Sequence, residues 1–178
     1  MDEKMKKEML SWVKSIVIAV VIVFVCRQFI FEPIAVRGES MLPTLEHNNR
    51  VVISKTSDIE RFDMIVFDAP DANAKYVKRV VGVPGDHIEM KDDVLYINSQ
   101  AYDEDYVKQS TTLSRTTQDF TLEELTQVSI IPEGHYFVLG DNRRKSNDSR
   151  EFGLISADTV LGEVKLRIYP FDEIEITE

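Results

Sequence analysis

The hydrophobic residues divide the chain into an apolar N-terminal segment and a longer region of short alternating runs. Residues 15–26, SIVIAVVIVFVC, carry no charge, and the apolar character extends over residues 12–31 with Lys14 and Arg27 near the two ends. A helix of roughly 20 apolar residues can span a bilayer, and long basic side chains near its ends can reach the interface. The pattern predicts a transmembrane anchor over residues 12–31.

Two other structures compete with the anchor. A cleavable signal peptide also has a charged start and an apolar core, but residues 27–38, RQFIFEPIAVRG, offer no cleavage site between small residues. A core helix of a globular domain is a weaker explanation, because a helix that packs on a core typically keeps a polar face towards solvent and this run is apolar on every face. An uncleaved anchor therefore fits the pattern best.

The basic residues around the apolar run predict its orientation. Four lysines precede the run, whereas the near flank beyond it holds only Arg27 and Arg37. Because flanking lysine and arginine favour the cytoplasmic side, residues 1–11 are expected to form a short cytoplasmic N-terminus. Residues 32–178 are then expected to form an extracytoplasmic domain, and the protein would be a single-pass protein of the cell membrane.

Beyond the anchor, β-branched runs alternate with turn residues, as is typical of strands. In GEVKLRIY (162–169) Val164, Leu166 and Ile168 alternate with charged residues, so that one face is apolar. KDD (91–93) and VPGD (83–86) are typical of tight turns. The sequence predicts one mainly β domain with strands over residues 50–54, 63–67, 76–83, 87–90, 94–98, 135–140 and 162–169.

Residues 102–130 interrupt this pattern with a polar region rich in serine and threonine. Within it, TLEEL is typical of a short helix that begins after Thr121, with Glu124 completing a capping box. We expect this range to be a variable insertion or a flexible excursion from the domain.

Composition narrows the range of functions. A chain of 178 residues accommodates one ordinary domain and an appendage. The net charge of −10 argues against a nucleic-acid partner, because phosphate binding depends on clustered lysine and arginine. Cys26 is the single cysteine, which excludes an intrachain disulfide framework and a multi-cysteine metal site. No cofactor and no metal is implied.

The stretch VRGESMLPTLEHN (36–48) places Ser40 in a glycine-containing bend. A serine hydroxyl needs a neighbouring base before it can attack a carbonyl. The chain has three histidines, none of them in an informative motif, and each is compatible with an ordinary surface position: His47, His87 and His135. The other candidate base is a lysine that burial keeps neutral.

Lys78 is a lysine that lies among apolar neighbours in the sequence. In YVKRVVGVPGD (76–86) the strand period places Lys78 on one face and Arg79 on the other face of an otherwise apolar strand. Arginine stays protonated, so Arg79 cannot be the base. The alternative explanation is that Lys78 lies on an edge strand and protects it from aggregation.

A third stretch, GDNRRKSNDSREFG (140–153), concentrates polar residues in a loop after a predicted strand. GESMLPTL, YVKRVVGVPGD and this stretch, in that order behind an N-terminal anchor, resemble the three motif regions of the bacterial type I signal peptidases. These are Ser-Lys membrane proteases. The resemblance covers nearly all of residues 12–170 and is weak over residues 100–130.

The resemblance implies roles for six residues. Ser40 is expected to be the nucleophile, Lys78 the general base and Ser146 a residue that helps to orient the lysine. Asp148 and Arg150 match a supporting ion pair, and Asp141 matches another aspartate of the third motif. Some members carry a serine two residues before the nucleophile, where this chain has Gly38. The oxyanion would then depend on backbone N–H groups, chiefly that of Ser40.

The resemblance also implies a fold and a substrate. The fold is a strongly bent antiparallel β-sheet domain whose apolar surface lies near the membrane. The substrate is the signal peptide of an exported preprotein, cut after small residues in an Ala-x-Ala pattern, and the lipid membrane is a further partner. Two alternatives remain open: an anchored Ser-His-Asp hydrolase, and a non-catalytic anchored binding module.

Overall fold

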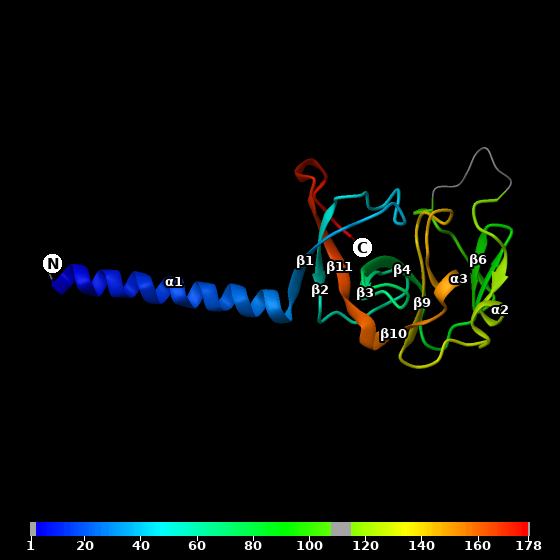
Figure 1. Ribbon diagram of the computed structural model, residues 1–178, viewed down its shortest axis with the longest axis horizontal. Coiled ribbons are helices and arrows are strands. Elements are labelled where there is room, and N and C mark those ends of the chain that lie inside the picture. The colour runs from blue at the N-terminus through cyan, green and yellow to red at the C-terminus, as the bar shows by residue number, and fades with distance from the viewer. Residues whose placement is uncertain (1–2, 108–114, 178) are drawn as a thin grey trace.

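The computed structural model describes residues 3–107 and 115–177. Helix α1 (Glu3–Phe29) projects away from the rest of the chain as a single long rod (Figure 1). Its part Met5–Phe29 is long and apolar enough to cross a membrane. Apolar side chains along it, such as Val17 and Phe24, are more than half exposed (55% and 66%).

Helix α1 ends at Phe29, before the limit at residue 31 that hydrophobicity indicates. Phe31 instead begins strand β1 (Phe31–Ala35), which pairs with β2 (Arg50–Ser54). The apolar run continues across this junction, so its composition does not reveal the boundary. Pro33 does contribute to it, because a residue that precedes proline, here Glu32, is driven away from helical backbone angles.

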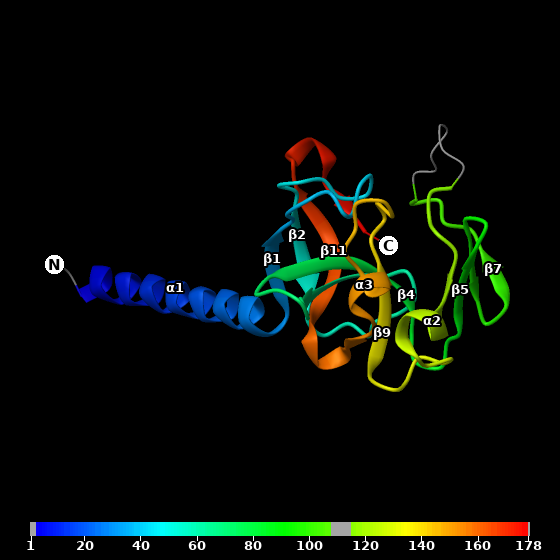
Figure 2. The same cartoon turned by 45° about the vertical axis from the view of Figure 1, so that its right-hand side comes forward.

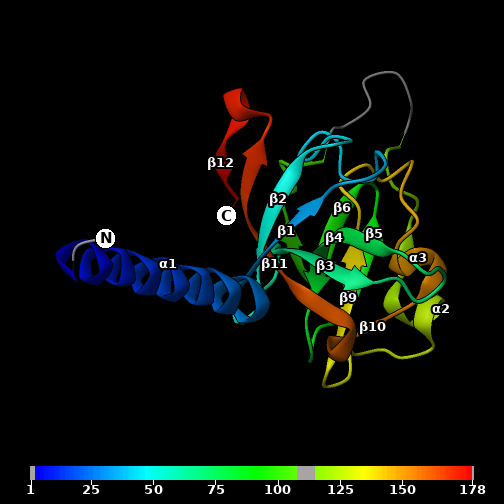
Figure 3. The ribbon, with the colours of Figure 1, turned by 60° about the vertical axis from the view of Figure 1, so that its left-hand side comes forward.

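The larger sheet follows the order β1-β2-β11-β3-β4-β9-β10, with β12 paired to β11, and every pair is antiparallel. Strands β1, β2 and β11 lie on the side from which α1 projects (Figure 3). Register shifts interrupt β11 and the β4–β9 pair, and such bulges bend a sheet. The remaining strands of this sheet are β3 (Met64–Asp68), β4 (Lys75–Gly82), β9 (His135–Leu139), β10 (Ile155–Ser156), β11 (Val160–Tyr169) and β12 (Glu175–Ile176).

A smaller antiparallel sheet has the order β7-β6-β5-β8 and lies at the end of the molecule away from α1 (Figure 2). Short helices connect or flank the sheets: α2 (Leu122–Thr126), α3 (Ser149–Phe152), η1 (Ala157–Thr159) and η2 (Phe171–Glu173). The strands of the smaller sheet are β5 (Ile88–Lys91), β6 (Val94–Ile97), β7 (Gln100–Tyr102) and β8 (Phe120–Thr121). The fold is therefore mainly β and antiparallel, as the sequence predicts.

The predicted turns are confirmed in detail. Asp92 and Asp93 have positive φ angles (51° and 63°) and form the two-residue loop of the β5–β6 hairpin. Gly85 has a φ of 89° in the turn after β4, which is the conformation a type II turn requires at that position. Thr121 and Glu124 form the predicted capping box of α2.

The range 102–130 is only partly described, since residues 108–114 lie outside the described residues. Phe120 and Leu122 are buried in the core of the smaller sheet (6% and 0% exposed), together with Met90 and Leu95. The end of this range is thus an integral part of the fold. Whether the range is a variable insertion stays a prediction.

Candidate active site

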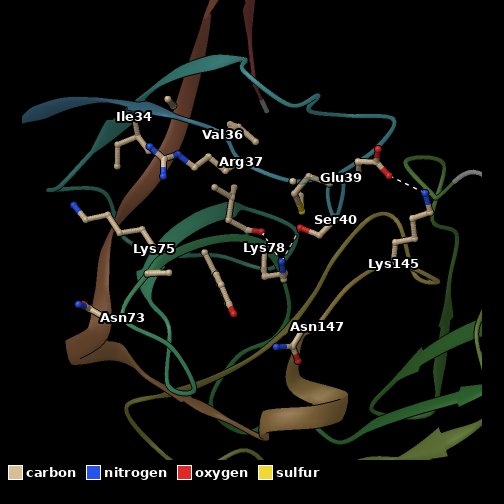
Figure 4. A pocket seen from close by; sticks show the side chains of 16 residues that line it. Ile34, Val36, Arg37, Glu39, Ser40, Asn73, Lys75, Lys78, Lys145 and Asn147 are labelled. Atoms are coloured by element: carbon tan, nitrogen blue, oxygen red, sulfur yellow. Dashed lines mark hydrogen bonds and ion pairs between the residues drawn. The ribbon is translucent and has the colours of Figure 1, made fainter.

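Ser40 lies in the turn that follows β1. Met41 and Leu45 are both 1% exposed and pack with Val36 in the core between the strands, so the apolar residues of this stretch fasten the turn to the domain. Gly38 has a φ of 89°, which L-residues with a side chain rarely adopt. The Ser40 side chain is left at the surface of a cleft (Figure 4).

Lys78 lies in the middle of strand β4, which is paired on one side with β3 and on the other with β9. Its residue exposure is 3%. The edge-strand explanation for this lysine is therefore wrong, because β4 is an inner strand and the side chain is buried. Tyr76, on the same face of the strand, places its ring 5.2 Å from Lys78 Nζ.

The two predicted reaction partners are in contact. Lys78 Nζ donates a hydrogen bond to Ser40 Oγ over 2.8 Å and a second one to the Val77 carbonyl oxygen over 3.2 Å (Figure 4). Burial lowers the pKa of Lys78 from 10.5 to about 8, against the opposing charges of Asp148, Asp141 and Asp71. At that pKa a useful fraction of the amine is neutral near pH 8.

The loop of residues 140–150, hereafter the third loop, packs directly on the serine turn. The Asn142 N–H donates to the Ser40 carbonyl oxygen over 2.9 Å, and its side-chain amide donates to the Glu39 carbonyl oxygen over 3.0 Å. Lys145 forms an ion pair with the Glu39 carboxylate at 2.7 Å. The third loop therefore holds the backbone on which the Ser40 hydroxyl is mounted.

Asp148 and Arg150 form the predicted ion pair, with Arg150 Nε 2.8 Å and Nη2 2.9 Å from the carboxylate oxygens. Asp148 also caps α3 and accepts the Gly140 N–H at 3.0 Å. Burial alone would raise the pKa of Asp148, but the hydrogen bonds and charge of Arg150 outweigh it and lower the pKa. The carboxylate is therefore ionised and stiffens the third loop.

Asp141 reaches outside its own loop. It accepts two hydrogen bonds from Arg79, at 2.9 and 2.7 Å, and one from the Thr44 hydroxyl at 2.5 Å. Arg79 in turn donates to the Phe62 carbonyl oxygen at 2.7 Å. The arginine beside Lys78 is thus a structural partner that joins β4 to the third loop and to the serine turn.

Ser146 differs from its expected geometry. Its hydroxyl is buried, and within the described ranges it makes no hydrogen bond with Lys78. It interacts instead with the Asp148 carboxylate, whose pKa it helps to lower. The side chain packs against Gly140, where an added Cβ atom would collide with both the Ser146 hydroxyl and the Ser40 carbonyl oxygen. An orienting role for Ser146 stays a prediction.

The three histidines interact with main-chain groups. His47 Nδ1 accepts the Gly38 N–H over 3.1 Å. His87 Nδ1 lies 2.7 Å from the Ser129 carbonyl oxygen, and His135 Nδ1 lies 3.1 Å from the Glu133 carbonyl oxygen. Across residues 3–107 and 115–177, no histidine is hydrogen-bonded to Ser40, so the geometry favours Lys78 over a histidine base.

The cleft around Ser40 has a volume of about 580 Å³ and runs from β1 to the third loop (Figure 4). Asn147 lines the cleft, and its side-chain amide donates to the Asp71 carboxylate over 2.6 Å. Within the described residues, no group of three His, Cys, Asp or Glu side chains is arranged to hold a metal ion. Sequence reasoning gave no role to several residues of the cleft, although the last two of them lie within the third motif: Arg37, Asn73, Lys75, Lys145 and Asn147.

Comparison with known proteins gives consistent results. A family model described as signal peptidase, peptidase S26, matches residues 9–169. Signal peptidase IB of Staphylococcus aureus is 44% identical over 182 residues, which cover 96% of this chain and 95% of that protein. Signal peptidase I of Bacillus caldolyticus is 45% identical over 163 residues, covering 88% of this chain and 89% of that protein.

A solved structure is also similar. The crystal structure of a signal peptidase I from Enterococcus faecalis V583 aligns with a TM-score of 0.56 and 45% sequence identity. The alignment covers 60% of this chain and 97% of the other.

Proposed function

The chain belongs to the signal peptidase family, peptidase S26, and on that premise we propose that it removes signal peptides from exported preproteins with Ser40 as nucleophile and Lys78 as general base. One observation carries the assignment of the residues. The Lys78 Nζ atom lies 2.8 Å from Ser40 Oγ, and the lysine is only 3% exposed. That burial supplies the neutral amine which the chemistry requires.

Acylation begins when neutral Lys78 accepts the hydroxyl proton of Ser40. Ser40 Oγ forms a bond to the carbonyl carbon of the scissile peptide, and the resulting ammonium group gives its proton to the departing amine of the mature protein. In deacylation, Lys78 takes a proton from water, the hydroxide attacks the ester, and the proton returns to Ser40 Oγ. No step needs a cofactor.

The oxyanion of each tetrahedral intermediate needs donors. Gly38 brings no hydroxyl, and its N–H is already bonded to His47 Nδ1. The Ser40 N–H makes no hydrogen bond within residues 3–107 and 115–177, so it is free to bind the oxyanion. We therefore assign the Ser40 N–H as the main donor.

The supporting residues act through position. Asp141 and Arg79 join β4 to the third loop, and Asp148 with Arg150 stiffens that loop. Ser146 packs behind Gly140, next to the Ser40 carbonyl oxygen. Together these contacts hold Lys78 and Ser40 at hydrogen-bonding distance before substrate binds, which is the preorganisation that catalysis needs.

The cleft begins where the anchor ends. Ile34, Ala35 and Val36 line it, and β1 starts directly after α1. A signal peptide held in the same membrane would meet this edge and lie extended beside it, with small residues, as in Ala-x-Ala, against the cleft floor. Helix α1 is then a single-pass anchor with residues 1–11 in the cytoplasm and the catalytic domain outside.

The proposal is tested by cleavage of a preprotein that carries an Ala-x-Ala site, with the full-length enzyme in lipid or detergent. Wild type is compared with Ser40→Ala, with Lys78→Ala and with a triple variant in which His47, His87 and His135 become alanine. We expect the serine and lysine variants to be folded but inactive, and the triple variant to remain active. A folded triple variant without activity would instead support a histidine base, and an intact preprotein with wild type would support a binding role.

A further inference from the structure

A buried ion pair joins the segment after β7 to the third loop. Arg143 Nη1 and Nη2 lie 2.9 and 2.5 Å from the two carboxylate oxygens of Glu104. The side chains are 1% and 8% exposed, respectively. Two charges so far from solvent are tolerated only when they are well paired, so this contact holds the two segments in one relative position.

Tyr106 extends the same contact to strand β4. Its hydroxyl donates to Glu104 Oε1 over 2.7 Å, and its ring lies 4.0 Å from Arg79 Cζ. Burial and the negative charge of Glu104 raise the pKa of Tyr106, so its hydroxyl stays a donor. Glu104 and Tyr106 therefore contact both the third loop and the arginine next to Lys78.

From Arg143 the contacts continue to the serine turn. Arg143 Nε donates to the Gly140 carbonyl oxygen at 3.1 Å, and the Arg143 carbonyl oxygen accepts from Arg150 Nη2 at 2.7 Å. The Gly140 N–H is held by Asp148, and Asn142 holds the Ser40 carbonyl oxygen. A displacement of Arg143 would thus be transmitted to the backbone on both sides of the nucleophile.

We propose that Glu104 is a positioning residue for the reaction, which through Arg143 fixes the third loop against Lys78 and Ser40. The inference rests on the proposed function, since it takes Lys78 as the base. Glu104 is not among the residues that line the cleft. Its effect is to keep Lys78 covered and to keep the serine turn in place.

This role has a consequence that a purely stabilising contact would lack. The charged groups that act on Lys78 are Asp148, Asp141, Asp71 and Arg150, and the largest influence on its pKa is burial. Three of those four charges belong to the third loop. If that loop loosens, water reaches Lys78 and the loss of burial raises its pKa from about 8. Withdrawal of the Asp148 and Asp141 charges acts in the opposite direction, but burial outweighs these charges, so the pKa rises.

The central variant is Glu104→Gln, which keeps the shape of the side chain and removes its charge. Glu104→Asp keeps the carboxylate on a shorter side chain, and Tyr106→Phe removes only the hydroxyl donor, so it serves if Glu104→Gln does not fold. Asp92→Asn is the matched control, because it breaks an exposed ion pair with Arg115 near the same sheet. Asparagine also tolerates the positive φ of residue 92.

Two readouts are needed. The first is the pH profile of kcat and KM for preprotein cleavage, with each variant assayed well below its own Tm. The second is the pKa of Lys78, obtained by NMR titration of lysine-labelled protein in the Ser40→Ala background and assigned by its loss in Lys78→Ala. The second readout is independent of activity, so failure of the proposed function in wild type leaves this inference testable.

For Glu104→Gln we expect kcat to fall at least about tenfold with KM changed less than about threefold, and the Lys78 pKa to rise by at least about half a unit. Glu104→Asp should recover part of the activity, Tyr106→Phe should move the pKa in the same direction, and Asp92→Asn should match wild type. A lower Tm with an unchanged Lys78 pKa would mean a structural role only and would overturn the proposal. An equal loss in Asp92→Asn would overturn it as well.

Discussion

The Nζ atom of Lys78 lies 2.8 Å from the Oγ atom of Ser40, although the two residues are 38 positions apart in the sequence. The serine is mounted on a turn and the lysine on the inner strand β4. The third loop bonds to the serine turn, and its partner Arg79 lies next to the lysine.

The pH dependence of cleavage should report the pKa of Lys78. Only the neutral amine can accept the Ser40 proton, and burial brings its pKa down to about 8. We expect kcat/KM to rise about tenfold per pH unit below that value and to level off above it. The measurement is a pH profile of kcat/KM with a preprotein substrate. An apparent pKa of about 6.5 in that profile, the ordinary value of histidine, would contradict the assignment of Lys78.

Replacing the lysine should stabilise the inactive protein. Below pH 8 the folded state carries the full cost of a buried ammonium, and a pKa lowered from 10.5 to about 8 corresponds to about 3 kcal/mol. As pH rises from about 8 to 10.5 the unfolded state binds more protons than the folded state, so wild-type stability increases and the cost disappears. Lys78→Met should therefore raise the free energy of unfolding at pH 7. Between pH 8 and 10.5 this free energy should increase less in the variant than in wild type, as measured by urea unfolding.

Breaking the pair between Arg79 and Asp141 should be costly. Their side chains are 6% and 0% exposed, so Asp141→Asn leaves an unpaired buried guanidinium group. A loss of roughly 3–5 kcal/mol in the free energy of unfolding is expected, together with reduced activity. Asp119→Asn is the control, since that carboxylate is 42% exposed and paired with an exposed arginine; its effect should stay below about 1 kcal/mol. Equal effects of the two changes would refute the argument.

Gly140→Ala should impair the enzyme without reaching the cleft. The new methyl group would collide with the side chain of Ser146 and with the Ser40 carbonyl oxygen, so the serine turn has to move. We expect kcat to fall at least about tenfold, because a small displacement of the nucleophile is enough. The double variant Gly140→Ala/Ser146→Gly relieves one of the two collisions. Its Tm should therefore lie between the Tm of Gly140→Ala and that of wild type. Wild-type kcat in Gly140→Ala would show that the turn tolerates the shift.

The long elements of the fold follow from local pattern. The β-branched run RVVIS predicts β2 at its observed limits, and the turns at Asp92 and Gly85 follow from residues that tolerate positive φ. The strands that pattern analysis missed are short or interrupted by proline, so they show no period: β1, β7, β8, β10 and β12. These strands exist because a neighbouring strand supplies hydrogen bonds, which no local window contains.

The residues of the candidate site also fall into two groups, those that the sequence identifies and those that it does not. Ser40, Lys78, Asp141, Asp148 and Arg150 could be identified from motifs. The pairs Glu104–Arg143 and Asp71–Asn147 could not, since their members are 39 and 76 positions apart and no motif marks Glu104 or Asp71. Such contacts depend on how the sheets and loops meet.

The sequence by itself determined the apolar helix, the mainly β character and the order of three motifs, because helix length, strand period and side-chain chemistry are properties of neighbouring residues. Only the tertiary structure decided that Lys78 is covered on an inner strand and touches Ser40. The reason is physical: a lysine becomes a base through loss of water, and the surrounding groups that remove water come from distant parts of the chain.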